Sequence, residues 1–245
     1  MEHPGARFLT AEWLHLAILN FEIDPAVLRP FVPVGTELAA WQNTTYVSLV
    51  GFQFRKVRVL GLPIPFHRNF DEVNLRFYVR CKTDDVWRRG VVFIKEFAPR
   101  RAVAWTARMF FGENYATVPM GHHVDSPSGD PNATRRASYW WTASGREHRL
   151  DFSTDGPAAL PSAGTTEEFI TEHYWGYSDG IGRATTEYRV DHARWNVWTA
   201  REAHFDGDAA SLYGQSFVES LTARPASAFM ADGSSVAVFL GRRIA

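Results

Sequence analysis

The chain has 245 residues, of which 45% are hydrophobic and 14% aromatic, and its formal net charge is −1. This composition predicts a large core, and without a basic excess we expect neither nucleic acid nor an anionic membrane as a partner. A single cysteine excludes an internal disulfide, and no apolar run reaches the roughly 20 residues of a membrane helix. We expect one soluble, cytoplasmic domain over residues 1–245 and leave homo-oligomer formation open.

Strand-like segments make up most of the chain. They are rich in β-branched and aromatic residues, and Gly, Pro, Asp or Ser residues separate them. In chain order they cover residues 12–23, 44–60, 72–81, 87–97, 183–205 and 234–244. Strands of this kind, broken by turn residues, predict a mainly β fold with antiparallel pairing.

Three other segments carry helix signals. The first has Asp24 as N-cap and Pro25 at the first helical position, and later prolines keep it short. The second covers Pro99–Gly112. The third begins at Thr165 or Thr166, whose hydroxyl can cap the segment EEFITEHYWGY. Helices are therefore expected to be the minor elements.

The stretch FDEVNLRFYVRC, residues 70–81, has different chemistry on the two faces of one strand. Since side chains alternate along a strand, one face carries Val73, Leu75, Phe77, Val79 and Cys81. The opposite face carries Glu72, Asn74, Arg76, Tyr78 and Arg80. The apolar face is expected in the core, and the polar face is either a wet surface or the lining of a cavity.

Several motifs, taken in their order and spacing, carry a resemblance to a known family. They are FEIDPAVLRPFVPVGTEL, YVSLVGFQF, FDEVNLRFYV, GVVFIKEF, EEFITEHYWGY and YRVDHARWNVW. With these motifs the chain resembles the YqjF-like family, an uncharacterised family (domain of unknown function 2071) in the acetoacetate decarboxylase-like superfamily. The resemblance implies a closed or nearly closed antiparallel β-barrel with a few peripheral helices and a cavity that can hold one ligand.

The decarboxylases of that superfamily form a Schiff base on one lysine of a pair, and the resemblance implies that this nucleophile is missing here. Aligned from Arg108, the lysine pair falls on Tyr115 and Ala116. Tyr115 could donate a hydrogen bond to a carbonyl or enolate oxygen, or its ring could fill the pocket. No cofactor is expected.

Lys95 is the lysine we consider for a relocated amine. The chain has three lysines, and in a strand Lys95 shares a face with Val91, Phe93 and Phe97, which could point inward. The more common alternative is an aliphatic stem on apolar surface with the ammonium in water.

Glu72 carries over best from the decarboxylase pattern, which has a glutamate on the corresponding strand facing the cavity. If Glu72, Asn74 and Arg76 line a barrel, Glu72 and Arg76 can form an ion pair. Alternatively, Arg76 or Arg108 can hold a substrate carboxylate in a bidentate fork. The competing interpretation is a surface network of ion pairs.

The histidines do not form a metal motif. His122 and His123 are adjacent, so on a strand they point to opposite faces, and no metal site is expected. His173 and Trp175, in the third helical segment, are expected to anchor that segment to the barrel wall or to form the rim of the cavity.

Three functions remain open from the sequence. The first is a barrel that binds a small carboxylate or carbonyl compound. The second is an enzyme, lyase or isomerase, that acts on a small keto acid without a Schiff base, with Glu72 for proton transfer and Tyr115 as oxyanion partner. The third is a structural or protein-interaction domain. A cavity lined by Glu72, Arg76, Arg108 and Tyr115 would favour the first two, and a barrel filled with side chains would favour the third.

Overall fold

The computed structural model describes residues 6–83, 85–99, 114–125, 130, 133–179 and 184–244. The first half of the chain holds β1 (Arg7–Glu22), α1 (Pro25–Leu28), η1 (Arg29–Phe31), β2 (Glu37–Leu38), β3 (Tyr46–Val59), β4 (Leu62–Pro63), β5 (Phe70–Thr83), β6 (Val86–Ala98), β7 (Tyr115–Thr117) and β8 (Met120–Val124). The second half holds β9 (Arg135–Ala143), β10 (Arg146–Thr154), α3 (Thr166–Thr171), β11 (Trp175–Asp179), β12 (Thr185–His192), β13 (Val197–Asp206), α4 (Ala209–Tyr213), η2 (Gln215–Phe217), α5 (Val218–Thr222), β14 (Ser227–Phe239) and β15 (Arg242–Arg243).

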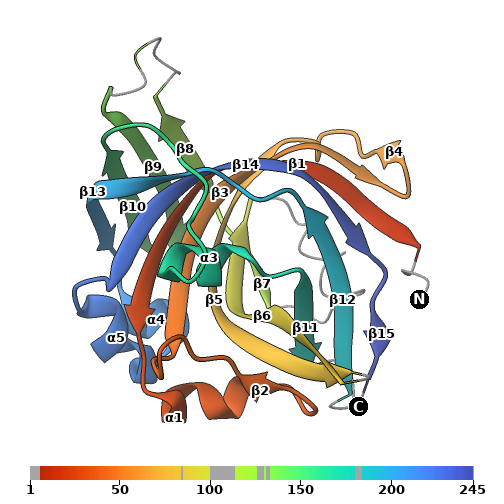
Figure 1. Ribbon diagram of the computed structural model, residues 1–245. Coiled ribbons are helices and arrows are strands. Elements are labelled where there is room, and N and C mark those ends of the chain that lie inside the picture. The colour runs from red at the N-terminus through yellow and green to blue at the C-terminus, as the bar shows by residue number, and fades with distance from the viewer. Residues whose placement is uncertain are drawn as a thin grey trace.

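Within the described residues, seven strands close into a barrel in the order β12-β11-β6-β5-β3-β1-β14, because β14 also pairs with β12. Figure 1 shows this ring of strands. The barrel strands pair antiparallel except at one place, where β11 runs parallel to β6 through Trp175–Gly90 and Gly176–Val91. The predicted mainly β, closed barrel is confirmed, and the parallel pair is a feature that strand patterns alone did not indicate.

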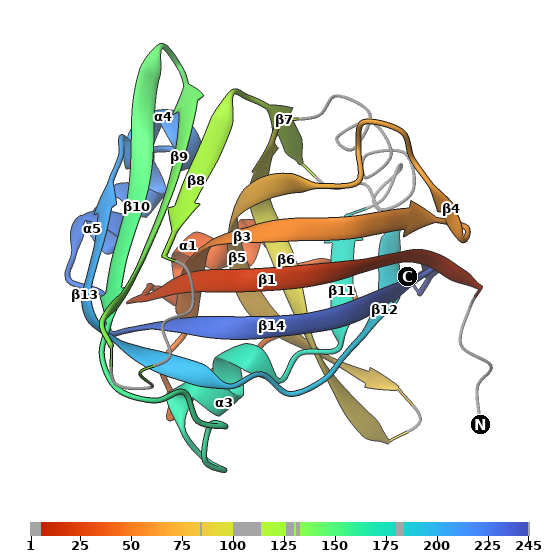
Figure 2. The same ribbon diagram turned by 90° about the horizontal axis from the view of Figure 1, so that it is seen from above.

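A second layer of strands continues from the barrel at β14. Strands β13, β10, β9 and β8 extend the sheet beyond β14, and α4 and α5 lie beside them (Figures 1 and 2). A large hydrophobic core includes residues from the outer face of the barrel and from this layer. The five apolar residues of β5 predicted to share a face all belong to it: Val73, Leu75, Phe77, Val79 and Cys81.

The opposite face of β5 points into the barrel over most of its length. Glu72, Asn74 and Arg76 are buried and line an internal cavity. Tyr78 is buried next to Phe169 of α3, with 5.4 Å between ring centroids. The polar face of this strand is therefore a cavity lining from Glu72 to Arg76, and it reaches the surface at Arg80, which is exposed and paired with Glu37.

Two of the predicted helix starts are present. Asp24 Oδ1 accepts a hydrogen bond from the Ala26 N–H at the start of α1, and Thr165 Oγ1 accepts one from the Glu168 N–H at the start of α3. Helix α3 ends at Thr171, so the expected continuation of this helix through residues 173 and 175 is wrong. None of the described helices is long and apolar enough to cross a membrane.

Candidate functional site

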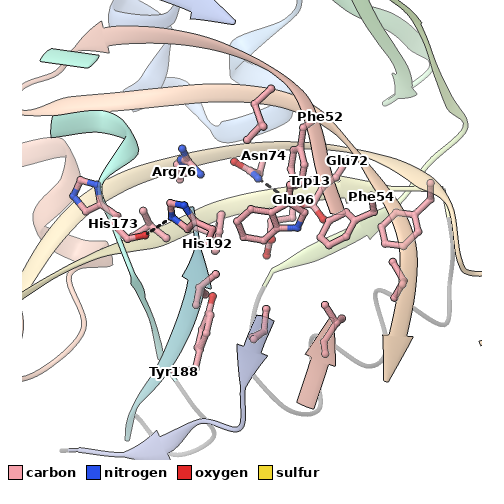
Figure 3. A pocket seen from close by; sticks show the side chains of 18 of the residues that line it. Trp13, Phe52, Phe54, Glu72, Asn74, Arg76, Glu96, His173, Tyr188 and His192 are labelled. Atoms are coloured by element: carbon pink, nitrogen blue, oxygen red, sulfur yellow. Dashed lines mark hydrogen bonds between the residues drawn. The ribbon is translucent and has the colours of Figure 1, made fainter. Parts of the chain in front are cut away.

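A cavity of about 220 Å³ lies inside the barrel. Side chains from β1, β3, β5, β6, β7, β11, β12 and β14 line it, together with α3 and the residues that follow it. Figure 3 shows Arg76 and His173 at one end of this cavity and Glu72, Trp13 and Phe54 at the other, with Asn74 and His192 between them. The polar side chains of β5 are thus spread along the length of the cavity.

The register of β5 against β6 places the polar side chains. Asn74 lies opposite Glu96, and Arg76 lies opposite Phe93. Glu72, Asn74 and Arg76 occupy alternate positions of one strand, so all three point inward. Glu96, which is 1% exposed, adds a second carboxyl group to the middle of the cavity.

Glu72 is held by two neighbours. Its Oε2 accepts a hydrogen bond from the Tyr115 hydroxyl at 2.6 Å, and its Oε1 accepts one from Asn74 Nδ2 at 3.0 Å. Burial raises the pKa of Glu72 to about 7, and the hydrogen bonds from Tyr115 and Asn74 and the charge of Arg76 offset this only in part. Glu72 can therefore exchange a proton near neutral pH.

Tyr115 reaches Glu72 because β7 runs parallel to β6, with Tyr115 opposite Glu96. The phenol ring lines the cavity. The 2.6 Å contact between the Tyr115 hydroxyl and Glu72 is compatible with both protonation states of Glu72. The phenol can donate a hydrogen bond to a carboxylate, and a carboxylic acid can donate one to the phenol oxygen. The structure thus brings the two residues predicted as a catalytic pair into direct contact.

Arg76 does not form the expected ion pair with Glu72. The residue is 8% exposed and lines the cavity, yet in the described part of the chain its guanidinium has no ion pair and its buried Nε has no hydrogen-bond partner. A buried cation without a partner is unfavourable, so the group is suited to an anion from outside the chain.

His173 lies next to Arg76 at the same end of the cavity (Figure 3). Burial lowers its pKa to about 3, the charge of Arg76 lowers it further, and the backbone of Ile170 offsets this only in part. The ring lies 4.6 Å from the Tyr78 ring, and neither ring nitrogen makes a hydrogen bond of good geometry to a described residue. His173 is therefore a neutral imidazole that can still accept or donate a hydrogen bond.

Other polar atoms of the cavity wall also lack partners among the described residues. They are Asn74 Oδ1 and Trp13 Nε1. Buried polar atoms in folded proteins are nearly always hydrogen-bonded to protein or to water. Their presence around one cavity indicates a site that solvent or a ligand completes.

Lys95 does not line the cavity, in contrast to the inward orientation considered from the sequence. Its Nζ donates to the Leu212 carbonyl at the end of α4, 3.0 Å away, and burial lowers the pKa of its ammonium. The cause is a β-bulge in β6: Leu75 pairs with Lys95 but Arg76 pairs with Phe93. The bulge shifts the alternation, so Phe93 and Glu96 point inward while Lys95 points outward.

Of the two remaining predicted site residues, one lines the cavity and the other lies outside the described residues. Trp175 begins β11 and lines the cavity. Arg108, and most of the expected helix Pro99–Gly112, fall outside the described residues. Sequence reasoning missed Glu96 and His192 as lining residues. The alternation of β12 is the signal that could have found His192, whereas the bulge hides Glu96.

Comparison with known sequences identifies the family. Residues 10–235 match the family DUF2071, described as an uncharacterized conserved protein. The chain belongs to the DUF2071 family. A stretch of 144 residues is 31% identical to the uncharacterized protein YqjF of Bacillus subtilis, covering 55% of this chain and 58% of YqjF. The chain therefore aligns with somewhat more than half of that relative.

Solved structures similar to this DUF2071 protein share its fold at low sequence identity. An acetoacetate decarboxylase-like enzyme from Sphingomonas wittichii has a TM-score of 0.67 at 13% identity, covering 98% of this chain and 93% of that one. The enduracididine biosynthesis enzyme MppR complexed with pyruvate has 0.67 at 14%, covering 100% and 92%. Acetoacetate decarboxylase from Legionella pneumophila has 0.65 at 14%, covering 98% and 86%. The protein thus has the acetoacetate decarboxylase-like fold.

Within the described residues, no group of three or more His, Cys, Asp or Glu side chains could hold a metal ion. His122 Nδ1 lies 2.8 Å from Asp71 Oδ2, while the neighbouring His123 is directed to Asp125. The adjacent histidines thus point to different partners, as expected for a strand. The chemistry of the described cavity residues is that of an anion-binding arginine, a neutral imidazole and a carboxyl–phenol pair.

Proposed function

We propose that this DUF2071 protein binds a small organic carboxylate or carbonyl compound inside its barrel, with Arg76 as the ligand of the carboxylate group. The observation that carries the proposal is the buried guanidinium of Arg76, which faces the cavity without a partner among the described residues. Arg–carboxylate pairs are short, frequently bidentate and stronger than neutral hydrogen bonds. His173 supplies a neutral hydrogen-bonding group at the same end.

A specific observation also supports an enzymatic role as a second candidate. Glu72 has a pKa of about 7 and touches the Tyr115 hydroxyl, so it is matched to proton transfer at neutral pH. In such an enzyme Glu72 would move a proton and Tyr115 would stabilise a developing oxyanion. None of the three lysines lines the cavity, so this chemistry would proceed without a Schiff base.

The cavity also bears on the third candidate, a structural or interaction domain. A barrel with only a structural task would gain stability from apolar side chains that fill its interior. A 220 Å³ space lined by Glu72, Arg76 and Tyr115 counts against that candidate.

Titration calorimetry with a panel of small carboxylic acids tests the proposal. Wild type and Arg76→Met are compared, and Arg80→Met is the matched control, because Arg80 lies on the same strand but is exposed and paired with Glu37. Loss of a charged hydrogen-bonding partner costs about 1.5–3 kcal/mol, so affinity should fall ~10- to 100-fold in Arg76→Met and stay unchanged in Arg80→Met.

Two results would count against carboxylate binding at Arg76. One is a panel in which no acid binds the wild type, and the other is equal affinity in Arg76→Met. For the enzymatic candidate, any acid that binds is followed for turnover in wild type and Glu72→Gln. Retained binding with lost turnover would assign Glu72 as the acid or base, and equal turnover would remove it from that role.

A further inference from the structure

The cavity has an aromatic end that the carboxylate site alone does not explain. Four of its lining side chains form what we call the aromatic corner: Trp13, Phe52, Phe54 and Phe70. Trp13 meets Phe52 and Phe54 edge to face, with centroids 5.7 Å and 5.9 Å away, and Phe54 stacks on Phe70 at 4.7 Å. Each of these rings presents apolar surface on which another ring can pack.

The aromatic corner lies at the opposite end of the cavity from Arg76 (Figure 3). Phe52 pairs with Glu72 and Phe54 pairs with Phe70, so the corner lies at the start of β5. Glu72 and Arg76 are four positions apart along β5, which places their Cα atoms about 13 Å apart. A ligand anchored on Arg76 therefore extends along β5 toward the corner.

Away from Arg76, the cavity disfavours a second anionic group on the ligand. Glu96 lines the middle of the cavity and Glu72 lies near the aromatic corner, opposite Phe52, and both are almost fully buried. Two carboxyl groups in a buried site repel a further carboxylate, or must stay protonated to accept it. The ligand is thus expected to carry one carboxylate at the arginine end.

The volume sets the size of the ligand. A protein cavity of about 150 Å³ holds benzene, which has six non-hydrogen atoms. By proportion, the 220 Å³ cavity holds about nine non-hydrogen atoms. A carboxylate uses three of these, which leaves room for one six-membered ring or an equally bulky branched chain.

We propose that the ligand is a monocarboxylic acid that bears a single aromatic ring or an equivalent apolar group, with its carboxylate on Arg76 and its ring against the aromatic corner. This inference rests on the proposed carboxylate site and adds the class of acid that the site takes. It distinguishes ring-bearing acids from short hydrophilic acids, which would leave the apolar end of the cavity without a partner.

The test compares matched acids by titration calorimetry on the wild-type protein. Benzoate, phenylacetate and 3-phenylpropionate form the ring series, acetate, pyruvate and acetoacetate form the short series, and succinate adds a second carboxylate. Burying a ring should make the best acid of the ring series bind at least ~10-fold more tightly than any short acid. Succinate should bind no better than acetate.

Two further measurements locate the ring. Phe52→Leu should weaken the ring series several-fold and leave the short series unchanged, while Phe77→Leu, the same change in the outer core, should leave both unchanged. Isotope-filtered nuclear Overhauser spectroscopy on ¹³C-labelled wild type with unlabelled acid needs no variant. Ring protons of the bound acid should show cross-peaks to aromatic ring protons of the protein.

The outcomes separate this inference from the proposed function. If short acids bind through Arg76 as tightly as ring acids, or if succinate binds best, the ring-acid inference is overturned and carboxylate binding stands. If ring acids bind with equal affinity in Arg76→Met, both the orientation inferred here and the carboxylate site fail. Tight, Arg76-dependent binding of a ring acid, with cross-peaks between its ring protons and aromatic protons of the protein, supports both.

Discussion

At the scale of single residues, the carboxyl group of Glu72 links pH to stability. Its pKa is about 7 in the folded protein and 4.5 for an unperturbed glutamate, so the folded state holds this proton more tightly. Stability is therefore lost as pH rises from 4.5 to 7, by about 3 kcal/mol, because ionising the buried group is unfavourable. Glu72→Gln removes this loss, since glutamine stays neutral.

Urea denaturation at pH 5 and pH 8 checks this expectation. Between these values the stability of Glu72→Gln relative to wild type should rise by about 3 kcal/mol. Glu37→Gln is the matched control, because Glu37 is exposed and paired with Arg80. An equal change with pH in both variants would show that the effect does not come from the buried carboxyl.

His173 makes the opposite contribution at lower pH. Its pKa is about 3 in the folded protein against 6.5 for an unperturbed histidine, so protonation favours the unfolded chain. The stability it supports is present above pH 6.5 and is lost as pH falls toward 3. Side-chain ¹H–¹⁵N NMR should show a neutral His173 from pH 5 to pH 8, whereas in urea the ring should titrate near ~6.5. A folded-state titration in that range would contradict the assigned burial.

At the scale of elements, strand alternation predicted the wall of the site on β5 but not on β6. Glu72, Asn74 and Arg76 follow a period of two without interruption, so the sequence pattern was sufficient. On β6 the bulge puts Lys95 outside and Glu96 inside. A bulge depends on the pairing of two strands, and nothing in the residues of β6 alone indicates it.

Helical elements show the same limit. The caps at Asp24 and Thr165 were readable because a cap is a local hydrogen bond. The end of α3 at Thr171 was not, since the following residues join the barrel as β11. Tertiary pairing there overrides a helix-compatible sequence.

The pair of strands β11 and β12 gives a testable packing constraint. Gly176 lies opposite Tyr188, whose ring covers the glycine, and a Cβ at Gly176 would lie 2.0 Å from the Tyr188 ring. In Gly176→Ala the ring must move, and because Tyr188 lines the cavity, the cavity changes shape. We expect a loss of about 1–3 kcal/mol of stability and weaker ligand binding.

A double-mutant cycle checks this packing constraint. Gly176→Ala should cost much less in a Tyr188→Leu background than in wild type, because leucine lacks the ring that the new methyl group meets. Stability is measured by urea denaturation and affinity by calorimetry. Additive effects of the two changes would mean that the ring does not limit residue 176.

At the scale of the whole molecule, closure of the barrel lay beyond local sequence patterns. It depends on pairs such as Val190 with Val238, which join distant strands, and on the parallel contact of β11 with β6. The family resemblance implied a barrel, and the structure adds which strands close it. The layer formed by β8, β9, β10 and β13 was not predicted. Its β9–β10 hairpin turns at Ser144 and Gly145, both with positive φ, a short-range signal that the sequence did contain.

The placement of all lysines decides what covalent chemistry the barrel can perform. Lys56 is exposed and paired with Glu12, Lys82 is exposed and paired with Asp85, and Lys95 points away from the cavity. An imine requires an amine that can reach the carbonyl carbon of a bound ligand. We therefore expect no imine in the barrel.

Borohydride reduction in the presence of pyruvate or acetoacetate tests this expectation, because it traps an imine as a stable amine that raises the protein mass. The intact mass of the folded protein should not change. Peptide mapping is the control for slow reaction at the terminal amine or at exposed Lys56 and Lys82. A stoichiometric adduct on Lys95 would require the bulge of β6 to shift and turn that residue inward, which would place this protein with Schiff-base enzymes. An unchanged mass together with Arg76-dependent binding would mean that the barrel fold is kept while the ligand is held without a covalent bond.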